Sequence, residues 1–316
     1  MSRYQRNTKL FELFNEPIFQ GWQHMLDYRR DDRDKELEQW TFARFGQEVL
    51  NGCNYLYEQT LVRQVFYPIW NEAQIEQDVG KKLTGVAAFP CETKSKFAVI
   101  CSGGGYGAVC SIIEGYPLAK KLNEMGYAAF VVCYRAGVAG VQPNPQEDLA
   151  ASIRFIIGHV EDFNLYGEDY AVMGFSAGAH LAGCFGIADI GYEKYCLPKP
   201  GVMILGYPVI SMDEIAHMGS RKNLFGEENE FHPELIEKYS IEKRITSDYP
   251  KTFLWQCSGD PVVSIEHSRL LANSLRVNGV DFLYEVYPYS CHGLDGAASD
   301  YEKGWIKRAT AFWKGR

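Results

Sequence analysis

Short apolar runs alternate with helical segments from about residue 84 onward, and this alternation limits the possible folds more than any other feature. The apolar runs cover 84–90, 96–103, 128–135, 170–175, 201–209, 252–259 and 281–288. Most are continuously apolar, as is typical of parallel strands covered on both faces. Helical patterns cover 117–126, 146–163, 264–279 and 301–315. Such alternation predicts right-handed βαβ units and an α/β fold with a doubly wound, mostly parallel sheet.

Two parts of the chain depart from this rhythm. Residues 1–80 are rich in aromatic and charged side chains and fit amphipathic helices. We expect them to form a helical extension that packs on a catalytic domain of residues 81–316; whether it serves as a cap, a dimerisation element or a packing layer stays open. Its mixed-charge run, residues 29–36, is interpreted as a solvated helix start. Residues 211–249 form a long insert between two predicted strands, at a point where inserts can cover an active site.

The composition excludes several classes of protein. A chain of 316 residues, 46% of them hydrophobic, can bury a sizeable core. The net charge of −8 and the absence of basic blocks argue against a nucleic-acid partner. No apolar stretch approaches the roughly 18 residues of a membrane helix, and the N-terminus does not resemble a signal peptide. The nine cysteines are scattered without a CxxC pair, which predicts buried thiols in a cytoplasmic protein and no metal site. Whether the chain forms a homo-oligomer stays open.

The sequence DYAVMGFSAGAHLAGC (169–184) contains the motif Gly-x-Ser-x-Gly, with Ser176 at its centre. The motif alone is weak evidence, but here an apolar strand precedes it and a small-residue helix follows it. In that context the turn is tight, and a side chain at Gly174 or Gly178 would clash. The turn would expose the Ser176 hydroxyl at the carboxyl end of the sheet, so we interpret Ser176 as a nucleophile rather than as an idle turn residue.

A serine nucleophile needs a base and a group that orients the base. In this strand–turn–helix context the chain order is Ser, then Asp or Glu, then His. His292 follows the last predicted strand, where the base belongs. Asp260 directly follows the strand at 252–259 and can hold the Nδ1–H of His292. We therefore predict the triad Ser176, Asp260 and His292.

Other polar residues are weaker candidates. His180 lies on the helix that follows Ser176 and is expected to be structural, because the turn directs the hydroxyl away from its own helix. His267 lies in a predicted helix and His232 in the insert, so both are expected to be structural or solvent-facing. Asp295 is interpreted as a turn residue and Asp148 as a helix cap or brace.

A glycine cluster in VICSGGGYGAV (99–109) predicts an oxyanion hole. Such a site needs backbone N–H groups aimed at the developing alkoxide. We assign these donors to Gly104 and Gly105, together with Ala177 after the nucleophile. A phosphate-binding role is excluded by the lack of GxGxxG with a later acid and of a GK[ST] sequence.

Taken together, these segments resemble the α/β-hydrolase superfamily, and within it the serine esterases related to bacterial acetyl esterases and acetyl-xylan esterases. The segments that carry the resemblance are CSGGGY, EGYP, NEMGYAAFVVCYR, GFSAGAHLAG, GSRKNLFG, TFLWQCSGD and CHGL, in this order between residues 84 and 316. Relatives have Pro or His where this chain has Ser102, and often a second acid where it has Pro261.

The resemblance implies hydrolysis of small acyl esters, often acetyl groups on sugars, through an acyl-enzyme. The predicted mechanism needs no metal or organic cofactor, and its expected partner is a small-molecule ester. Two alternatives stay open at this point. The same triad can serve an amidase, a formamidase or a small peptidase, and the scaffold can serve a binding protein without catalysis.

Overall fold

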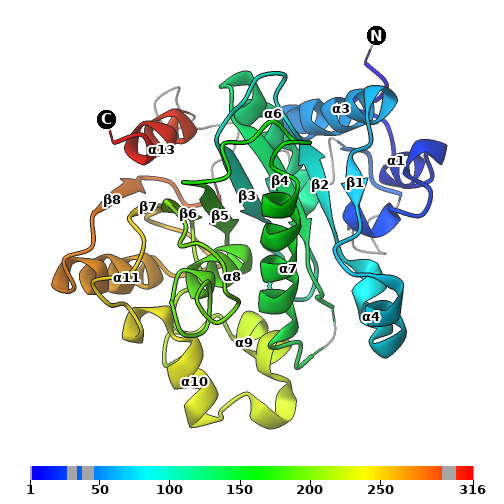
Figure 1. Cartoon of the computed structure of the whole chain (residues 1–316). Helices are drawn as coiled ribbons and strands as arrows, with labels where there is room; N and C mark the ends of the chain where they lie inside the picture. Colours follow the sequence, from blue (N-terminus) through cyan, green and yellow to red (C-terminus); the bar gives the residue numbers. More distant parts are fainter. Residues whose placement is uncertain (1, 27–33, 38–45, 138, 294–303, 316) are drawn as a thin grey trace.

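A central sheet of eight strands organises the molecule in the computed structural model (Figure 1), which describes residues 2–26, 34–37, 46–137, 139–293 and 304–315. The strands are β1 (Phe66–Tyr67), β2 (Gly85–Phe89), β3 (Phe97–Cys101), β4 (Ala128–Cys133), β5 (Ala171–Phe175), β6 (Val202–Gly206), β7 (Thr252–Cys257) and β8 (Phe282–Tyr287). Their order across the sheet is β1-β2-β4-β3-β5-β6-β7-β8. All seven predicted strands are confirmed.

The sheet is parallel from β4 to β8 and antiparallel at its other edge. Val99 pairs with Phe130 and Val172 in parallel register, whereas β2 runs antiparallel to both β1 and β4. Every residue of β2 to β7 is buried, while β8 at the far edge is mostly half-buried. The continuous apolar runs thus correspond to strands covered on both faces.

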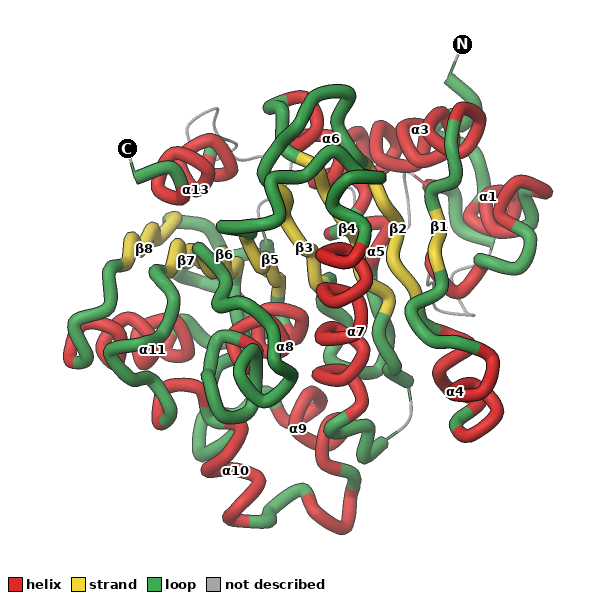
Figure 2. The backbone as a smooth tube through the Cα atoms, viewed as in Figure 1, coloured by secondary structure: helices red, strands yellow, loops and turns green. Residues whose placement is uncertain are grey.

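Helices cover both faces of the sheet. The tube view shows α7, α8 and α11 on one side and α6 and α13 on the other (Figure 2). The helices of the sheet region are α5 (Ser111–Glu114), α6 (Tyr116–Glu124), α7 (Asn144–Gly158), α8 (Ala177–Phe185), α11 (Glu266–Val277) and α13 (Trp305–Trp313). This arrangement confirms the doubly wound, mostly parallel sheet.

The end of α7 differs from the prediction of a helix over 146–163. The helix begins at Asn144, with Pro145 in its first turn, and ends at Gly158. His159 leaves helical geometry, and its Nδ1 lies 2.7 Å from the carbonyl oxygen of Phe155. A side chain that bonds a terminal carbonyl in this way helps to end a helix.

The N-terminal region packs on the sheet and also extends it. It contains α1 (Leu10–Phe14), α3 (Gly46–Val62) and α4 (Glu72–Gln77), and it adds the two-residue strand β1, which the sequence patterns do not predict. Helix α3 contacts α6. Tyr116 of α6 donates a hydrogen bond of 2.6 Å to the carbonyl of Met25. Residues 29–33 of the mixed-charge run lie outside the described residues.

The insert between β6 and β7 contains α9 (Met218–Phe225) and α10 (Pro233–Tyr239). It reaches the glycine loop after β3, because Asn223 of α9 donates a hydrogen bond of 2.9 Å to the carbonyl of Gly105. Within the described ranges, no helix combines the length and apolar character needed to cross a membrane.

Candidate active site

Ser176 lies in a sharp turn between β5 and α8. Its backbone angles are φ 54° and ψ −123°, a strained conformation for a residue with a side chain. The neighbouring structure holds the turn in place: the Ser176 amide donates to the Gly206 carbonyl at 3.1 Å, and the Val209 amide donates to the Ser176 carbonyl at 3.1 Å. A Cβ at Gly174 or Gly178 would collide with backbone atoms, which explains both glycines of the motif.

Ser176, His292 and Asp260 form a hydrogen-bonded chain. His292 Nε2 lies 2.9 Å from Ser176 Oγ, and His292 Nδ1 lies 2.8 Å from Asp260 Oδ2. The imidazole therefore donates from Nδ1 to the carboxylate and presents Nε2 as an acceptor to the serine hydroxyl. The structure brings together these three predicted residues from the ends of β5, β7 and β8.

Asp260 is fixed by several donors besides His292. Its side chain is fully buried, and Oδ1 accepts from the amides of Val262 and Val263 at 2.9 and 3.0 Å. Gln256 Nε2 donates to Oδ2 at 3.3 Å. A buried carboxylate with this many donors stays in one orientation and holds the imidazole with it.

The glycine loop after β3 lies against the turn of Ser176. A Cβ at Gly103 would be 2.8 Å from Ser176 Cβ, so glycine alone allows this approach. Gly104 and Gly105 have φ of 126° and 64°, in the region that favours glycine. Within the described residues, the amides of Gly104, Gly105 and Ala177 have no hydrogen-bond acceptor. Ala177 directly follows Ser176, and Gly104 and Gly105 follow Gly103 in the loop, so these unpaired N–H groups stay the predicted donors of an oxyanion hole.

Three further residues border the site and were not predicted from the sequence. Tyr207 directly follows β6, and its ring meets that of His292 edge-on, with centroids 4.7 Å apart. Glu114 accepts a hydrogen bond of 2.7 Å from the Tyr207 hydroxyl. Burial raises the pKa of Glu114, against the effect of its hydrogen bonds from Tyr207 and Gly103. Two sequence features could have drawn attention to these residues. Glu114 belongs to the EGYP segment, and Tyr207 follows the carboxyl end of a strand.

The third such residue is His217, which caps the N-terminus of α9. Its Nδ1 accepts from the Ser220 amide at 3.2 Å, so the ring proton lies on Nε2. Burial lowers the pKa of His217, and the positive charge that His292 can carry lowers it further. This electrostatic effect makes His217 a candidate neighbour of the His292 imidazole. No sequence pattern distinguishes it from other insert residues.

The other histidines are structural or exposed, as expected. His180 is fully buried, with its ring between the Tyr106 hydroxyl at 2.8 Å and the Tyr239 carbonyl at 2.7 Å. Burial lowers the pKa of His180 to about 4. His267 is buried too, accepts from backbone amides of the insert, and has its pKa lowered by burial to about 4. His232 is exposed before α10.

Asp148 braces the structure and takes no part in the site. It is fully buried and accepts hydrogen bonds from Arg135 and from the Trp70 indole. Asp295 lies outside the described residues. No group of three or more His, Cys, Asp or Glu side chains that could hold a metal ion occurs among residues whose placement is described.

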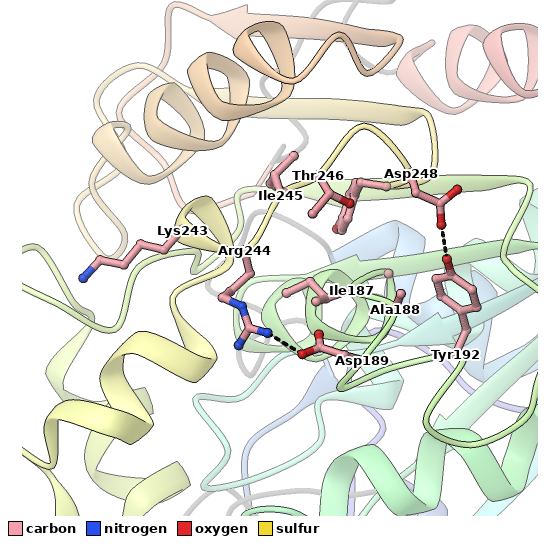
Figure 3. Close-up of a pocket in the computed structure, with 11 residues that line it drawn as sticks. Ile187, Ala188, Asp189, Tyr192, Lys243, Arg244, Ile245, Thr246 and Asp248 are labelled. Carbon is pink, nitrogen blue, oxygen red and sulfur yellow. Dashed lines mark hydrogen bonds and ion pairs between the residues drawn. The ribbon is translucent and has the colours of Figure 1, made fainter.

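A cavity of about 320 Å³ follows the end of α8 (Figure 3). Four of its charged and polar groups form two pairs: Arg244 binds Asp189 at 2.6 Å, and the Tyr192 hydroxyl donates to Asp248 at 2.5 Å. None of the three triad residues lines it. The cavity is therefore separate from the site around Ser176.

Comparison with known proteins relates residues 89–275 to the BD-FAE family. The chain is 33% identical to endo-1,4-beta-xylanase B of Butyrivibrio fibrisolvens over 68% of its own length and 35% of that protein. It is 31% identical to an acetylxylan esterase of Xylanibacter ruminicola over 66% of its own length and 43% of that protein. The chain thus spans less than half the length of these curated relatives.

Solved structures show the same fold. An acetyl ester-xyloside bifunctional hydrolase from Caldicellulosiruptor lactoaceticus superposes with a TM-score of 0.69 at 31% identity, over 80% of this chain and 96% of that one. A carboxylesterase from Lactobacillus plantarum superposes with a TM-score of 0.63 at 19% identity, over 73% of this chain and 92% of that one. These matches confirm the α/β-hydrolase fold and the family resemblance found in the sequence.

Proposed function

The chain belongs to the BD-FAE family, and on that premise we propose that it is a serine carboxylesterase that removes small acyl groups, above all acetyl groups, from esters. The observation that carries the proposal is the hydrogen-bonded chain from Ser176 Oγ through His292 to the buried carboxylate of Asp260. Its distances match those that a nucleophile, a base and an orienting acid require.

In the acylation step, Ser176 Oγ attacks the ester carbonyl while His292 Nε2 accepts the hydroxyl proton. Asp260 holds the Nδ1–H and stabilises the imidazolium that forms. The negative charge on the former carbonyl oxygen is stabilised by the amides of Gly104, Gly105 and Ala177. Loss of one such donor typically lowers kcat by about 10²–10³-fold.

Collapse of this intermediate releases the alcohol, which takes the proton from His292, and leaves the acyl group on Ser176. Water then attacks the acyl-enzyme while His292 accepts its proton. The second intermediate releases the carboxylic acid and returns the proton to Ser176 Oγ. Each proton that leaves a nucleophile passes through His292 Nε2, so this one nitrogen serves both half-reactions.

Acetylated carbohydrate is the proposed substrate class. The support comes from the relatives, which include an acetylxylan esterase and an acetyl ester-xyloside hydrolase. The proposed mechanism is the same for any alcohol, so the sugar is tested separately from the reaction.

The first test is hydrolysis of p-nitrophenyl acetate, butyrate and octanoate by the wild type and by Ser176→Ala. We expect acetate to be the best substrate and the variant to lose at least about 10⁴-fold in kcat. Ser264→Ala, which changes an exposed serine before α11, serves as the control and should retain activity. Wild-type inactivity, or activity that survives in Ser176→Ala, would contradict the proposal.

A second panel addresses the substrate. Acetylated xylo-oligosaccharides are compared with glyceryl triacetate, and aryl formamides and short peptides are run beside them. A kcat/KM for acetate release that is higher on the oligosaccharides than on glyceryl triacetate supports carbohydrate esters as the substrate class. Preferential cleavage of the amides would assign the same triad to an amidase.

A further inference from the structure

The carboxylate of Glu114 connects the two halves of the catalytic machinery. Glu114 is the last residue of α5, and its Oε2 accepts a hydrogen bond from the amide of Gly103. Its Oε1 accepts from the Tyr207 hydroxyl at 2.7 Å. One side chain thus contacts the glycine loop on one side and, through Tyr207, the ring of His292 on the other.

On the side of the loop, Glu114 and Ser176 enclose Gly103 between them. A Cβ at Gly103 would lie 2.8 Å from Ser176 Cβ and 3.0 Å from Glu114 Oε2. Because the Gly103 amide already donates to Glu114, it is not available as an oxyanion donor. The following amides, of Gly104 and Gly105, keep their unpaired orientation.

On the side of the base, Tyr207 is held at two points. Its hydroxyl binds Glu114, and its amide donates to the Trp255 carbonyl at 2.7 Å. Its backbone has φ 37°. The ring then meets the His292 ring edge-on, with an interplanar angle of 70°. A tyrosine fixed at both ends limits how far the imidazole can tilt away from Ser176.

We propose that Glu114 is a positioning residue, which sets the oxyanion loop through Gly103 and the catalytic imidazole through Tyr207. This inference rests on the proposed esterase function and adds a role for a residue that does not touch the substrate. Misplacement of reacting groups by about 1 Å can cost about 10²-fold in rate, so two modest contacts suffice for a large effect.

The variants Glu114→Gln and Tyr207→Phe test this role. Glu114→Gln weakens the hydrogen bonds of residue 114 with Gly103 and Tyr207, and Tyr207→Phe removes the hydroxyl that binds Glu114. Both substitutions change the side-chain volume little. Glu124→Gln is the matched control, because Glu124 is exposed at the end of α6 and pairs with Lys120. For each variant we measure kcat and KM with p-nitrophenyl acetate, the acylation burst, and the Ki of an aryl trifluoromethyl ketone. That ketone forms a tetrahedral adduct with the serine and occupies the oxyanion hole.

We expect Glu114→Gln to lower kcat by about 10- to 100-fold with KM nearly unchanged, and to raise the ketone Ki in parallel. Tyr207→Phe should show a smaller loss of the same kind. The double variant should lose less than the product of the two single effects, because both act through one connection. Glu124→Gln should match the wild type.

An unchanged kcat in Glu114→Gln would overturn the inference while the esterase activity stands. A lower kcat of Glu114→Gln with an unchanged ketone Ki would also overturn the inference. A residue that positions the oxyanion loop and the imidazole must affect binding of the tetrahedral adduct. If Glu114→Gln fails to fold, Tyr207→Phe decides, since it leaves the carboxylate and its Gly103 contact in place. Wild-type inactivity would instead contradict the proposed function.

Discussion

Ser176 illustrates how the site depends on single residues. Its left-handed backbone is a conformation that costs about 1–3 kcal/mol and persists only where neighbouring structure maintains it. That support comes from the Gly206 carbonyl and the Val209 amide, which bond to both backbone polar groups of Ser176. The strain raises the hydroxyl out of the sheet and toward His292.

Replacement of Asp260 by asparagine separates orientation from folding. The amide oxygen of the new side chain can still accept from Val262 and Val263, so the loop keeps its shape. Its NH₂ group, however, favours the wrong tautomer of His292. We expect Asp260→Asn to lower kcat by about 10⁴-fold, as measured with p-nitrophenyl acetate, with little change in the urea midpoint.

Asp281→Asn, which changes an exposed aspartate before β8, is the control and should leave both quantities unchanged. A variant Asp260→Asn within tenfold of wild-type kcat would remove Asp260 from the proposed mechanism.

The buried histidines predict how stability depends on pH. Burial lowers the pKa of His180 and of His267 to about 4, whereas the unfolded chain has a pKa near 6.5. Between these values the unfolded state binds more protons, so the free energy of unfolding rises with pH. The stability is fully present above about pH 6.5 and is lost as the pH falls toward 4. Each histidine contributes a slope of about 1.4 kcal/mol per pH unit in this window.

Urea unfolding between pH 5 and 6.5 measures this slope. His180→Asn should reduce it by about 1 kcal/mol per pH unit over this range, whatever the variant's absolute stability. His232→Asn, which changes an exposed histidine, should retain the wild-type slope. Equal slopes in His180→Asn and the wild type would show that the buried ring does not titrate as described.

At the scale of elements, α9 connects the insert to the glycine loop after β3. Asn223→Ala removes the hydrogen bond to the Gly105 carbonyl and leaves the backbone contacts of Asn223 intact. We expect kcat/KM to fall about tenfold through a looser loop, with a loss of about 1 kcal/mol in stability. Lys222→Ala, on the exposed side of the same helix, should change neither value. If both substitutions lowered kcat/KM and stability equally, the hydrogen bond from Asn223 to Gly105 would have no specific effect on the loop.

Elements with strong local patterns were predictable, and those that depend on tertiary contacts were not. The apolar runs of β2 to β8 predicted strands, but a run such as GVAAF carries no information on direction, and β2 proved antiparallel to β4. Strand β1 has two residues and exists because β2 offers it a partner. The order Ser, Asp, His located the three residues that the structure brings together.

The contact of Glu114 with Tyr207 was out of reach of the sequence for the same reason. It joins positions 93 residues apart, on α5 and after β6, and neither position has a pattern that names the other. A buried acid bound to a tyrosine that packs on His292 becomes visible only when the fold places these segments together.

At the scale of the whole molecule, the N-terminal region is part of the folded unit. Leu10, Phe19, Met25, Val49 and Leu56 are fully buried, and β1 completes the sheet edge. Removal of residues 1–63 would expose the face of α6 that α3 covers. We expect the truncated chain to be largely insoluble on expression, because exposed apolar surface of this kind promotes aggregation.

Tyr116→Phe provides a milder probe of the same interface. It removes the hydrogen bond to the Met25 carbonyl, so unfolding in urea should show a loss of about 1 kcal/mol. A soluble truncated chain with the wild-type urea midpoint would instead make the N-terminal region a separable appendage.

The position of the triad along the chain also determines when the serine becomes reactive during biosynthesis. Ser176 leaves the ribosome 116 residues before His292, the base proposed to activate it. Domains begin to fold from the N-terminus during synthesis, so the strained turn can form well before β8 joins the sheet. Under the proposed mechanism, a nascent chain therefore carries an inert hydroxyl until His292 has been made and β8 has joined the sheet, so the first turnover would report completion of the fold.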